Sequence, residues 1–173
     1  MSIIDKWREL QAPLREEIMY GVFHKNSVLE LGCGKGELAS EIYQKNPNIR
    51  YIGVDLDPRL VEDARKNLSD YNHRLFVADA STFRMPGNQT VDAVVSLLLM
   101  FPLNIDFYGV GKLKNKFHET AYNALSKQGR YIFGTSSQNL EDELLDSGFG
   151  VMCTTPIRYA GVFTGHIYDC EKI

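Results

Sequence analysis

Residues 27–42 read SVLELGCGKGELASEI and join a strand-like segment to a helix-like one. The short apolar run Val28–Leu31 has the composition of a buried strand. Three glycines then alternate at Gly32, Gly34 and Gly36. The residues that follow place apolar side chains at helical spacing. A strand, a glycine loop and a helix in this order are typical of a backbone that approaches a nucleotide closely.

Strand-like and helix-like segments continue to alternate along the chain. The further strand-like segments are Tyr51–Asp55, Leu75–Asp79, Asp92–Ser96, Arg130–Gly134, Phe149–Thr154 and Val162–Cys170. Asp57 and Pro58 are typical of the N-cap and first position of an intervening helix. The alternation predicts an α/β fold with a mostly parallel sheet and helices on both faces. Too few residues separate the last two strands for a crossover helix. We therefore expect a seven-stranded sheet with a terminal antiparallel hairpin and one reversed strand at its edge.

The composition argues against several classes of protein. The chain has 173 residues, is 44% hydrophobic and carries a net charge of −3, so a general nucleic-acid surface is not expected. The three cysteines, Cys33, Cys153 and Cys170, form no C-x-x-C pair, which argues against a disulfide framework or a metal site and favours a cytoplasmic setting. Because no apolar run is long enough to span a bilayer and the N-terminus does not resemble a signal peptide, no membrane partner is expected.

Acidic residues stand at or near the ends of three successive predicted strands: Glu30, Asp55 and Asp79. A dinucleotide needs G-x-G-x-x-G, but the third glycine comes one residue early here. The carboxylates would also repel phosphates, and Lys35 is the only cation close by in the sequence. S-adenosylmethionine carries a sulfonium and an ammonium and no phosphate, so these acids favour it. Glu30 can face the ammonium or bond loop amides, Asp55 can accept from the ribose hydroxyls, and Asp79 from the adenine amino group.

From about Ser27 to Phe149, the chain resembles the class I S-adenosylmethionine-dependent methyltransferases. ELGCGKG is similar to their E/D-x-G-x-G-x-G motif. Four further segments of the chain resemble the later motifs of the family and occur in the same order: YIGVDLDPRLVEDARKNL, LFVADASTF, VDAVVSLLLM and LSKQGRYIF. The resemblance implies a Rossmann-like fold, S-adenosyl-L-methionine as cofactor and S-adenosyl-L-homocysteine as product. It also implies cofactor contacts from Glu30, Gly32, Cys33, Gly34, Gly36, Asp55, Leu56, Asp79, Ala80 and Ser96.

Two parts make up the expected single domain. Residues 1–26 are interpreted as an N-terminal helical segment that packs on the core, and residues 27–173 as the methyltransferase domain. Ile3, Trp7 and Leu10 fall at helical spacing, and Pro13 is predicted to break or restart that helix.

The segment after the fourth strand, Leu97–Gly111, is expected to face the acceptor. Its candidate substrate-binding residues are Met100, Phe101, Phe107 and Tyr108, and the candidates for a catalytic role are Asp106 and Tyr108. The chain reads SLLLMFPL where enzymes that methylate base and amide nitrogens carry N/D-P-P-Y/F, which disfavours those acceptors. We expect direct in-line transfer to a small molecule. The alternatives are an RNA or protein acceptor with a partner subunit, and a catalytically silent cofactor-binding subunit.

Overall fold

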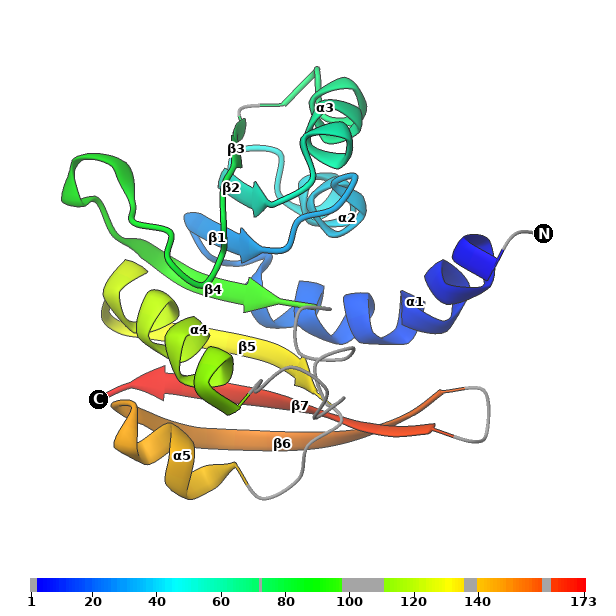
Figure 1. Ribbon diagram of the computed structural model, residues 1–173. Coiled ribbons are helices and arrows are strands. Elements are labelled where there is room, and N and C mark those ends of the chain that lie inside the picture. The colour runs from blue at the N-terminus through cyan, green and yellow to red at the C-terminus, as the bar shows by residue number, and fades with distance from the viewer. Residues whose placement is uncertain (1–2, 72, 98–110, 136–139, 160–162) are drawn as a thin grey trace.

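The computed structural model describes residues 3–71, 73–97, 111–135, 140–159 and 163–173. Seven strands form one sheet in the order β3-β2-β1-β4-β5-β7-β6 (Figure 1). Their bounds are β1 Ser27–Leu31, β2 Arg50–Asp55, β3 His73–Val77, β4 Val91–Ser96, β5 Leu125–Thr135, β6 Phe149–Tyr159 and β7 Phe163–Lys172. The α-helices are α1 Ile3–Val22, α2 Glu37–Lys45, α3 Pro58–Asn67, α4 Gly111–Ala124 and α5 Glu141–Asp146, and a 3-10 turn, η1, spans Pro86–Asn88. The α/β class, the seven strands and the terminal hairpin are thereby confirmed.

The reversed strand does not lie at the edge, so that part of the prediction was wrong. Strand β7 pairs antiparallel with both β5 and β6, and β6 forms the edge. The chain crosses over through α5, leaves a gap of one strand, and then folds back into the gap as β7. Pairing on both sides gives β7 two ladders of backbone hydrogen bonds, and the ladder with β7 extends β6 to Tyr159, beyond the predicted end at Thr154.

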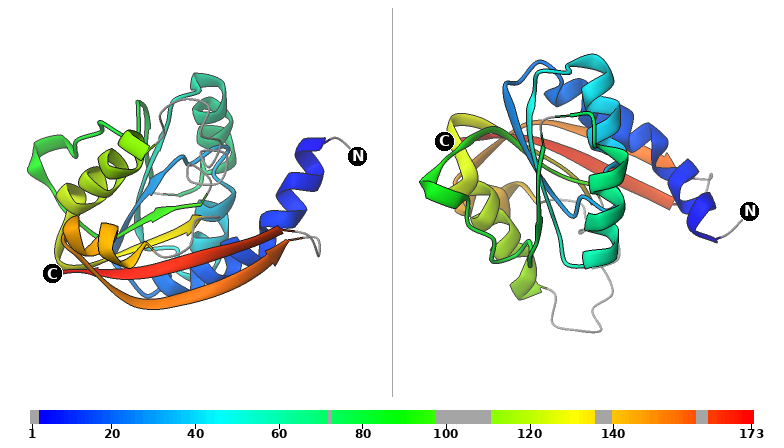
Figure 2. Two further views of the ribbon diagram at one scale, coloured as in Figure 1. Left: turned by 60° about the horizontal axis from the view of Figure 1, so that its bottom comes forward. Right: turned by 90° about the horizontal axis from the view of Figure 1, so that it is seen from above.

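Each face of the sheet carries its own apolar core and its own helices. One core joins Leu29, Val54 and Phe133 to α4 and α5, and the other joins Val28, Tyr51 and the apolar faces of α1 and α2. Figure 2 shows α4 and α5 on one side of the sheet and α1, α2 and α3 on the other. Because alternate residues of a strand point to opposite faces, Val28 and Glu30 share the α1–α2 side. This parity places the Glu30 side chain under α2.

Helix α1 runs through Pro13 without ending, so the predicted break was wrong. Proline removes one hydrogen bond from a helix interior, and this loss is tolerated where packing holds the turns on either side. Pro13 is exposed, whereas the neighbouring residues Leu14, Ile18 and Val22 are buried against the sheet. Their burial keeps the helix continuous. Among the described helices, none is both long and apolar enough to cross a membrane.

The start of α3 follows the prediction from Asp57 and Pro58. The Asp57 carboxylate accepts a hydrogen bond of 2.9 Å from the backbone N–H of Arg59, and Pro58 occupies the first turn. Hydrogen bonds from Arg59 also lower the pKa of the Asp57 carboxyl to about 2. A capped α3 therefore begins directly after the carboxyl end of β2.

Candidate functional site

The glycine loop between β1 and α2 is folded back onto the end of β2. Gly32, Gly34 and Gly36 all have positive φ, at 84°, 52° and 80°. The backbone N–H groups of Gly32 and Cys33 both donate to the Val54 carbonyl, at 2.7 and 3.0 Å. A left-handed backbone costs other residues about 1–2 kcal/mol each, so three such positions in five residues require glycine. The result is a tight loop whose backbone lies open to a close ligand.

The Asp55 carboxylate braces this loop from the end of β2. Its Oδ2 accepts from the Gly34 N–H and its Oδ1 from the Asp57 N–H, each at 2.9 Å. A carboxylate has about four acceptor positions, so further donors can be accommodated. Asp55 is partly exposed, whereas the Asp57 carboxylate is engaged by Arg59. This geometry assigns the cap to Asp57 and leaves Asp55 for a ligand.

Glu30 has a different environment from the one expected. Its carboxyl is only 3% exposed and accepts a short hydrogen bond from the Tyr51 hydroxyl on the neighbouring strand. Burial raises the pKa of Glu30 to about 8, although the Tyr51 hydrogen bond acts in the opposite direction.

Cys33 is also buried at 3%, and burial raises the pKa of its thiol far above the ordinary value. Its sulfur lies against Gly53, where an added Cβ would come within 3.0 Å. Cys33 is therefore a small packing residue with an unreactive thiol.

The third acid, Asp79, lies two residues beyond the end of β3 rather than within the strand. Its Oδ1 accepts from both the N–H and the hydroxyl of Ser81, each at 2.8 Å, which fixes the turn. The Asp79 side chain is exposed, next to the buried Ala80. Near the tip of β2, Leu56 is 71% exposed, an unusual position for a large apolar side chain. Carboxylates and apolar side chains thus alternate along this edge.

Two further observations bear on which ligand this edge fits. The ammonium of Lys35 lies 3.1 Å from a carboxylate oxygen of Asp63, so the one cation of the glycine loop is already paired. At the end of β4, the Ser96 hydroxyl is buried and has no hydrogen-bond partner among the described residues. A buried hydroxyl without a partner is costly and indicates a missing donor or acceptor. The carboxylates and the pairing of Lys35 with Asp63 fit a cationic nucleoside better than a pyrophosphate, whereas the Ser96 hydroxyl could bond either ligand.

Comparison with known proteins agrees with this geometry. Residues 28–109 match the family model described as a methyltransferase domain. A tRNA1(Val) (adenine(37)-N6)-methyltransferase from Porphyromonas gingivalis is 29% identical over 130 residues, which cover 66% of this chain and 51% of that protein. The structure of magnesium protoporphyrin IX methyltransferase from Synechocystis with bound S-adenosylmethionine superposes with a TM-score of 0.76. That match is 14% identical and covers 98% of this chain and 83% of the other. The chain is therefore similar to class I S-adenosylmethionine-dependent methyltransferases in this part of its sequence and shares their fold.

The match to curated methyltransferases covers only part of their length. A tRNA (guanine-N(7)-)-methyltransferase from Christiangramia forsetii is 40% identical over 65 residues, which cover 30% of this chain and 29% of that protein. The chain thus spans between about a third and a half of these two curated relatives.

The methyltransferase fold brings most of the predicted cofactor residues to one edge of the sheet. Strands β1, β2, β3 and β4 run parallel, so their carboxyl ends meet at this edge. The glycine loop and Asp55 are in direct contact there, Leu56, Asp79 and Ala80 follow the ends of β2 and β3, and Ser96 is the last residue of β4. The acceptor-side candidates lie outside the described residues: Met100, Phe101, Asp106, Phe107 and Tyr108. S-adenosylmethionine is the methyl donor of this family, and the residues present fit it.

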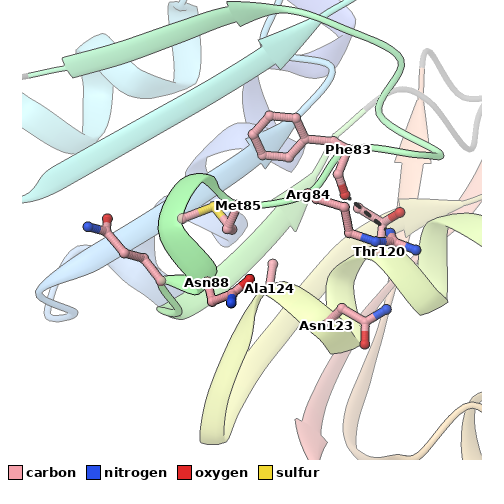
Figure 3. A pocket seen from close by; sticks show the side chains of 8 residues that line it. Phe83, Arg84, Met85, Asn88, Thr120, Asn123 and Ala124 are labelled. Atoms are coloured by element: carbon pink, nitrogen blue, oxygen red, sulfur yellow. Dashed lines mark hydrogen bonds between the residues drawn. The ribbon is translucent and has the colours of Figure 1, made fainter.

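The structure also has a cavity of about 330 Å³ away from this edge (Figure 3). It lies between the 83–89 segment and the last turns of α4, which end where β5 begins. Figure 3 shows Phe83, Met85 and Ala124 along its wall, together with Asn88 and Asn123. Because α4 leads down to the amino end of β5, the cavity opens toward the edge opposite the glycine loop. It is therefore separate from the cofactor site.

Sequence reasoning missed the hydrogen bond from Tyr51 to Glu30. In the sequence Tyr51 is one aromatic residue within the apolar strand YIGVD, which is typical of core packing. The strand register pairs Val28 with Tyr51 and Glu30 with Gly53, which places the tyrosine diagonally across from the glutamate. The feature that indicates this contact is a carboxyl on one strand and a tyrosine on the neighbouring strand, two residues before the position that pairs with the carboxyl residue. Recognising it required the register.

Proposed function

We propose that this protein is an S-adenosylmethionine-dependent methyltransferase that transfers a methyl group to a small-molecule acceptor by direct in-line displacement. The observation that carries the proposal is the acidic edge of the sheet. Glu37, Asp55 and Asp79 all lie in or beside the segments that follow β1, β2 and β3. Two nearby cations, Lys35 and Arg59, are paired with Asp63 and Asp57. Such an edge attracts a cationic cofactor and repels a polyanionic acceptor.

The proposed roles follow from where each side chain lies. Asp55 accepts from the ribose hydroxyls while it holds the glycine loop through the Gly34 N–H. Asp79 offers its second carboxylate oxygen to the adenine amino group, because the first is engaged by Ser81. The exposed Leu56 side chain and Ala80 give the flat base apolar contacts. Each charge-assisted hydrogen bond contributes roughly 1.5–3 kcal/mol when well formed.

The main requirement of the reaction is that the acceptor atom and the methyl group are correctly aligned. The sulfonium, when bound, supplies a methyl group on a good leaving group, and the protein has to hold the acceptor in line with it. Correct positioning of two reactants can supply about 7–11 kcal/mol of the barrier. Residues Met100, Phe101, Phe107 and Tyr108 are proposed to wall the acceptor, with Asp106 or Tyr108 orienting it or accepting its proton. An aromatic face beside the sulfonium would add roughly 0.5–2 kcal/mol of cation–π attraction.

Calorimetry with S-adenosylmethionine tests the cofactor assignment. We expect Asp55→Ala to weaken binding by at least about tenfold, since it removes a charge-assisted acceptor. Asp57→Ala is the matched control, because it removes the neighbouring carboxylate that caps α3. Circular dichroism establishes that both variants fold. Equal affinity of Asp55→Ala and the parent protein would refute the ribose assignment.

A methyl-donor assay tests the acceptor class. Isotopically labelled S-adenosylmethionine is incubated with a small-metabolite extract, with total tRNA and with a protein extract, and mass spectrometry identifies any labelled product. The proposal expects label in the small-metabolite arm, and Asp55→Ala should abolish it. Label confined to tRNA would instead support an RNA acceptor, which the 40% identity to a tRNA methyltransferase over 65 residues favours.

A further inference from the structure

The Glu30–Tyr51 pair stands out as the one buried carboxyl–phenol contact at the cofactor edge among the described residues. Glu30 is 3% exposed and Tyr51 is fully buried, and the Tyr51 hydroxyl donates to Glu30 Oε2. Glu30 lies one residue before the end of β1, directly ahead of the glycine loop. A carboxyl in this position directly precedes the loop assigned to the cofactor, yet it is shielded from water and contacts β2 through Tyr51.

The charged and titratable groups around Glu30 do not supply a full counter-charge. On its own side of the sheet, the Glu37 and Asp55 carboxylates raise its pKa, and the Arg15 guanidinium lowers it by less. The Arg15 side chain already bonds the Glu41 carboxylate of α2 at 2.8 Å. Cys33, the remaining nearby titratable group, keeps its thiol proton because of burial. With burial raising the pKa to about 8, the Glu30 carboxyl holds its proton at neutral pH while the site is empty.

Resting on the proposed function, we infer that Tyr51 is a positioning residue that holds the Glu30 carboxyl for the α-ammonium of the cofactor, and that cofactor binding expels the Glu30 proton. The exchange balances: a neutral carboxyl and an ammonium become a carboxylate–ammonium pair, and one proton passes to solvent. The Tyr51 hydrogen bond favours the charged carboxylate, so it makes this ionisation easier. The site then distinguishes ligands by whether they carry the α-ammonium, and this selectivity does not depend on the sulfonium.

The linkage predicts a specific pattern among ligands. S-adenosylmethionine and S-adenosylhomocysteine both carry the ammonium, so each should release close to one proton on binding near pH 6.5–7. The α-amino group of the free ligand titrates at about 8 and is still charged in that range. 5′-Methylthioadenosine contains the nucleoside without the amino acid, and its binding should release none. Affinity for the two complete ligands should rise by up to about tenfold per pH unit from pH 6 to 7.5.

Isothermal titration calorimetry in buffers of different ionisation enthalpy measures the protons released. Tyr51→Phe should weaken S-adenosylmethionine and S-adenosylhomocysteine binding by about tenfold at pH 7, which corresponds to raising the pKa of Glu30 by one further unit, and leave methylthioadenosine unchanged. Glu30→Gln should flatten the pH dependence of affinity for S-adenosylmethionine and S-adenosylhomocysteine. Tyr131→Phe is the matched control, since it removes a buried phenolic hydroxyl from the core on the opposite face of the sheet.

The outcomes separate this inference from the proposal beneath it. Tight S-adenosylmethionine binding with no proton release and a flat pH profile would overturn the inference and leave the cofactor assignment standing. A Tyr51→Phe variant that loses methylthioadenosine affinity as strongly as S-adenosylmethionine affinity would reduce Tyr51 to a structural role and overturn it as well. A folded parent protein that binds none of the three ligands would overturn both the inference and the proposed function. Thermal melts of each variant by circular dichroism show that it is folded.

Discussion

Glu30→Gln should change how the stability of the ligand-free protein depends on pH. Burial raises the pKa of Glu30 to about 8 in the folded protein, against 4.5 for an ordinary glutamate. The native state therefore keeps this proton to a higher pH than the unfolded chain does. Stability from this group is fully present below pH 4.5 and is lost as pH rises toward 8. Glutamine is neutral at every pH in this range, so the stability of the variant should not fall with pH in this way.

The size of the effect follows from the same interval. At about 1.4 kcal/mol per pH unit, a rise from 4.5 to about 8 corresponds to a loss of up to roughly 5 kcal/mol in the parent protein. We expect the two proteins to differ in free energy of unfolding by less than about 1 kcal/mol at pH 5, where glutamine can also accept from Tyr51. At pH 8.5, the variant should be more stable by about 3–5 kcal/mol. That difference is a large fraction of the stability of a typical domain.

Urea unfolding followed by circular dichroism at pH 5, 6, 7, 8 and 8.5, without ligand, measures this difference. Other titrating groups contribute equally to both proteins, so subtracting one curve from the other isolates Glu30. Glu17→Gln, at an exposed position on α1, is the matched control and should give a difference that does not vary with pH. If the Glu30→Gln difference is constant across this range, the carboxyl is already ionised in the folded protein, and the reasoning from its burial fails.

Two further predictions concern the loop and the aromatic core. Gly36→Ala should destabilise the protein by about 2–3 kcal/mol in urea unfolding, because its φ is +80° and an added Cβ would lie 3.0 Å from Leu68. Gly87→Ala, with φ +66° and nothing within 4 Å, should cost only about 1 kcal/mol, and equal costs would contradict the role given to Leu68. Tyr131→Phe should raise the free energy of unfolding by about 1 kcal/mol, because the Tyr131 hydroxyl is buried without a hydrogen-bond partner among the described residues. A marked loss of stability would mean that the hydroxyl is bonded.

Some parts of the site follow directly from local sequence. The glycine loop could be predicted because only glycine adopts three left-handed conformations so close together, and the structure shows all three. The cap of α3 could be predicted because an aspartate before a proline acts on amides only two residues away. The placement of Asp55 beside the loop also followed, since the carboxyl ends of parallel strands meet at one edge.

Other parts depend on groups that are far apart in the sequence. Glu30 and Tyr51 are separated by 21 residues, and their bond exists only because the register of β1 and β2 sets them diagonally opposite. The pairing of Lys35 with Asp63 likewise requires the glycine loop to lie beside α3, where Asn67 also donates to the Lys35 carbonyl. The place of β7 between β5 and β6 was set by hydrogen bonding on both of its edges.

The sequence by itself determined the order of strands and helices, the conformation of the glycine loop and the identity of the acids near the strand ends. These features depend on backbone sterics and on hydrogen bonds between near neighbours, which each local segment encodes. Only the tertiary structure decided which acid is exposed and which is buried, which cation is already paired, and where the reversed strand lies. Burial and long-range pairing set the charge state of a side chain, and both arise only when distant segments pack together.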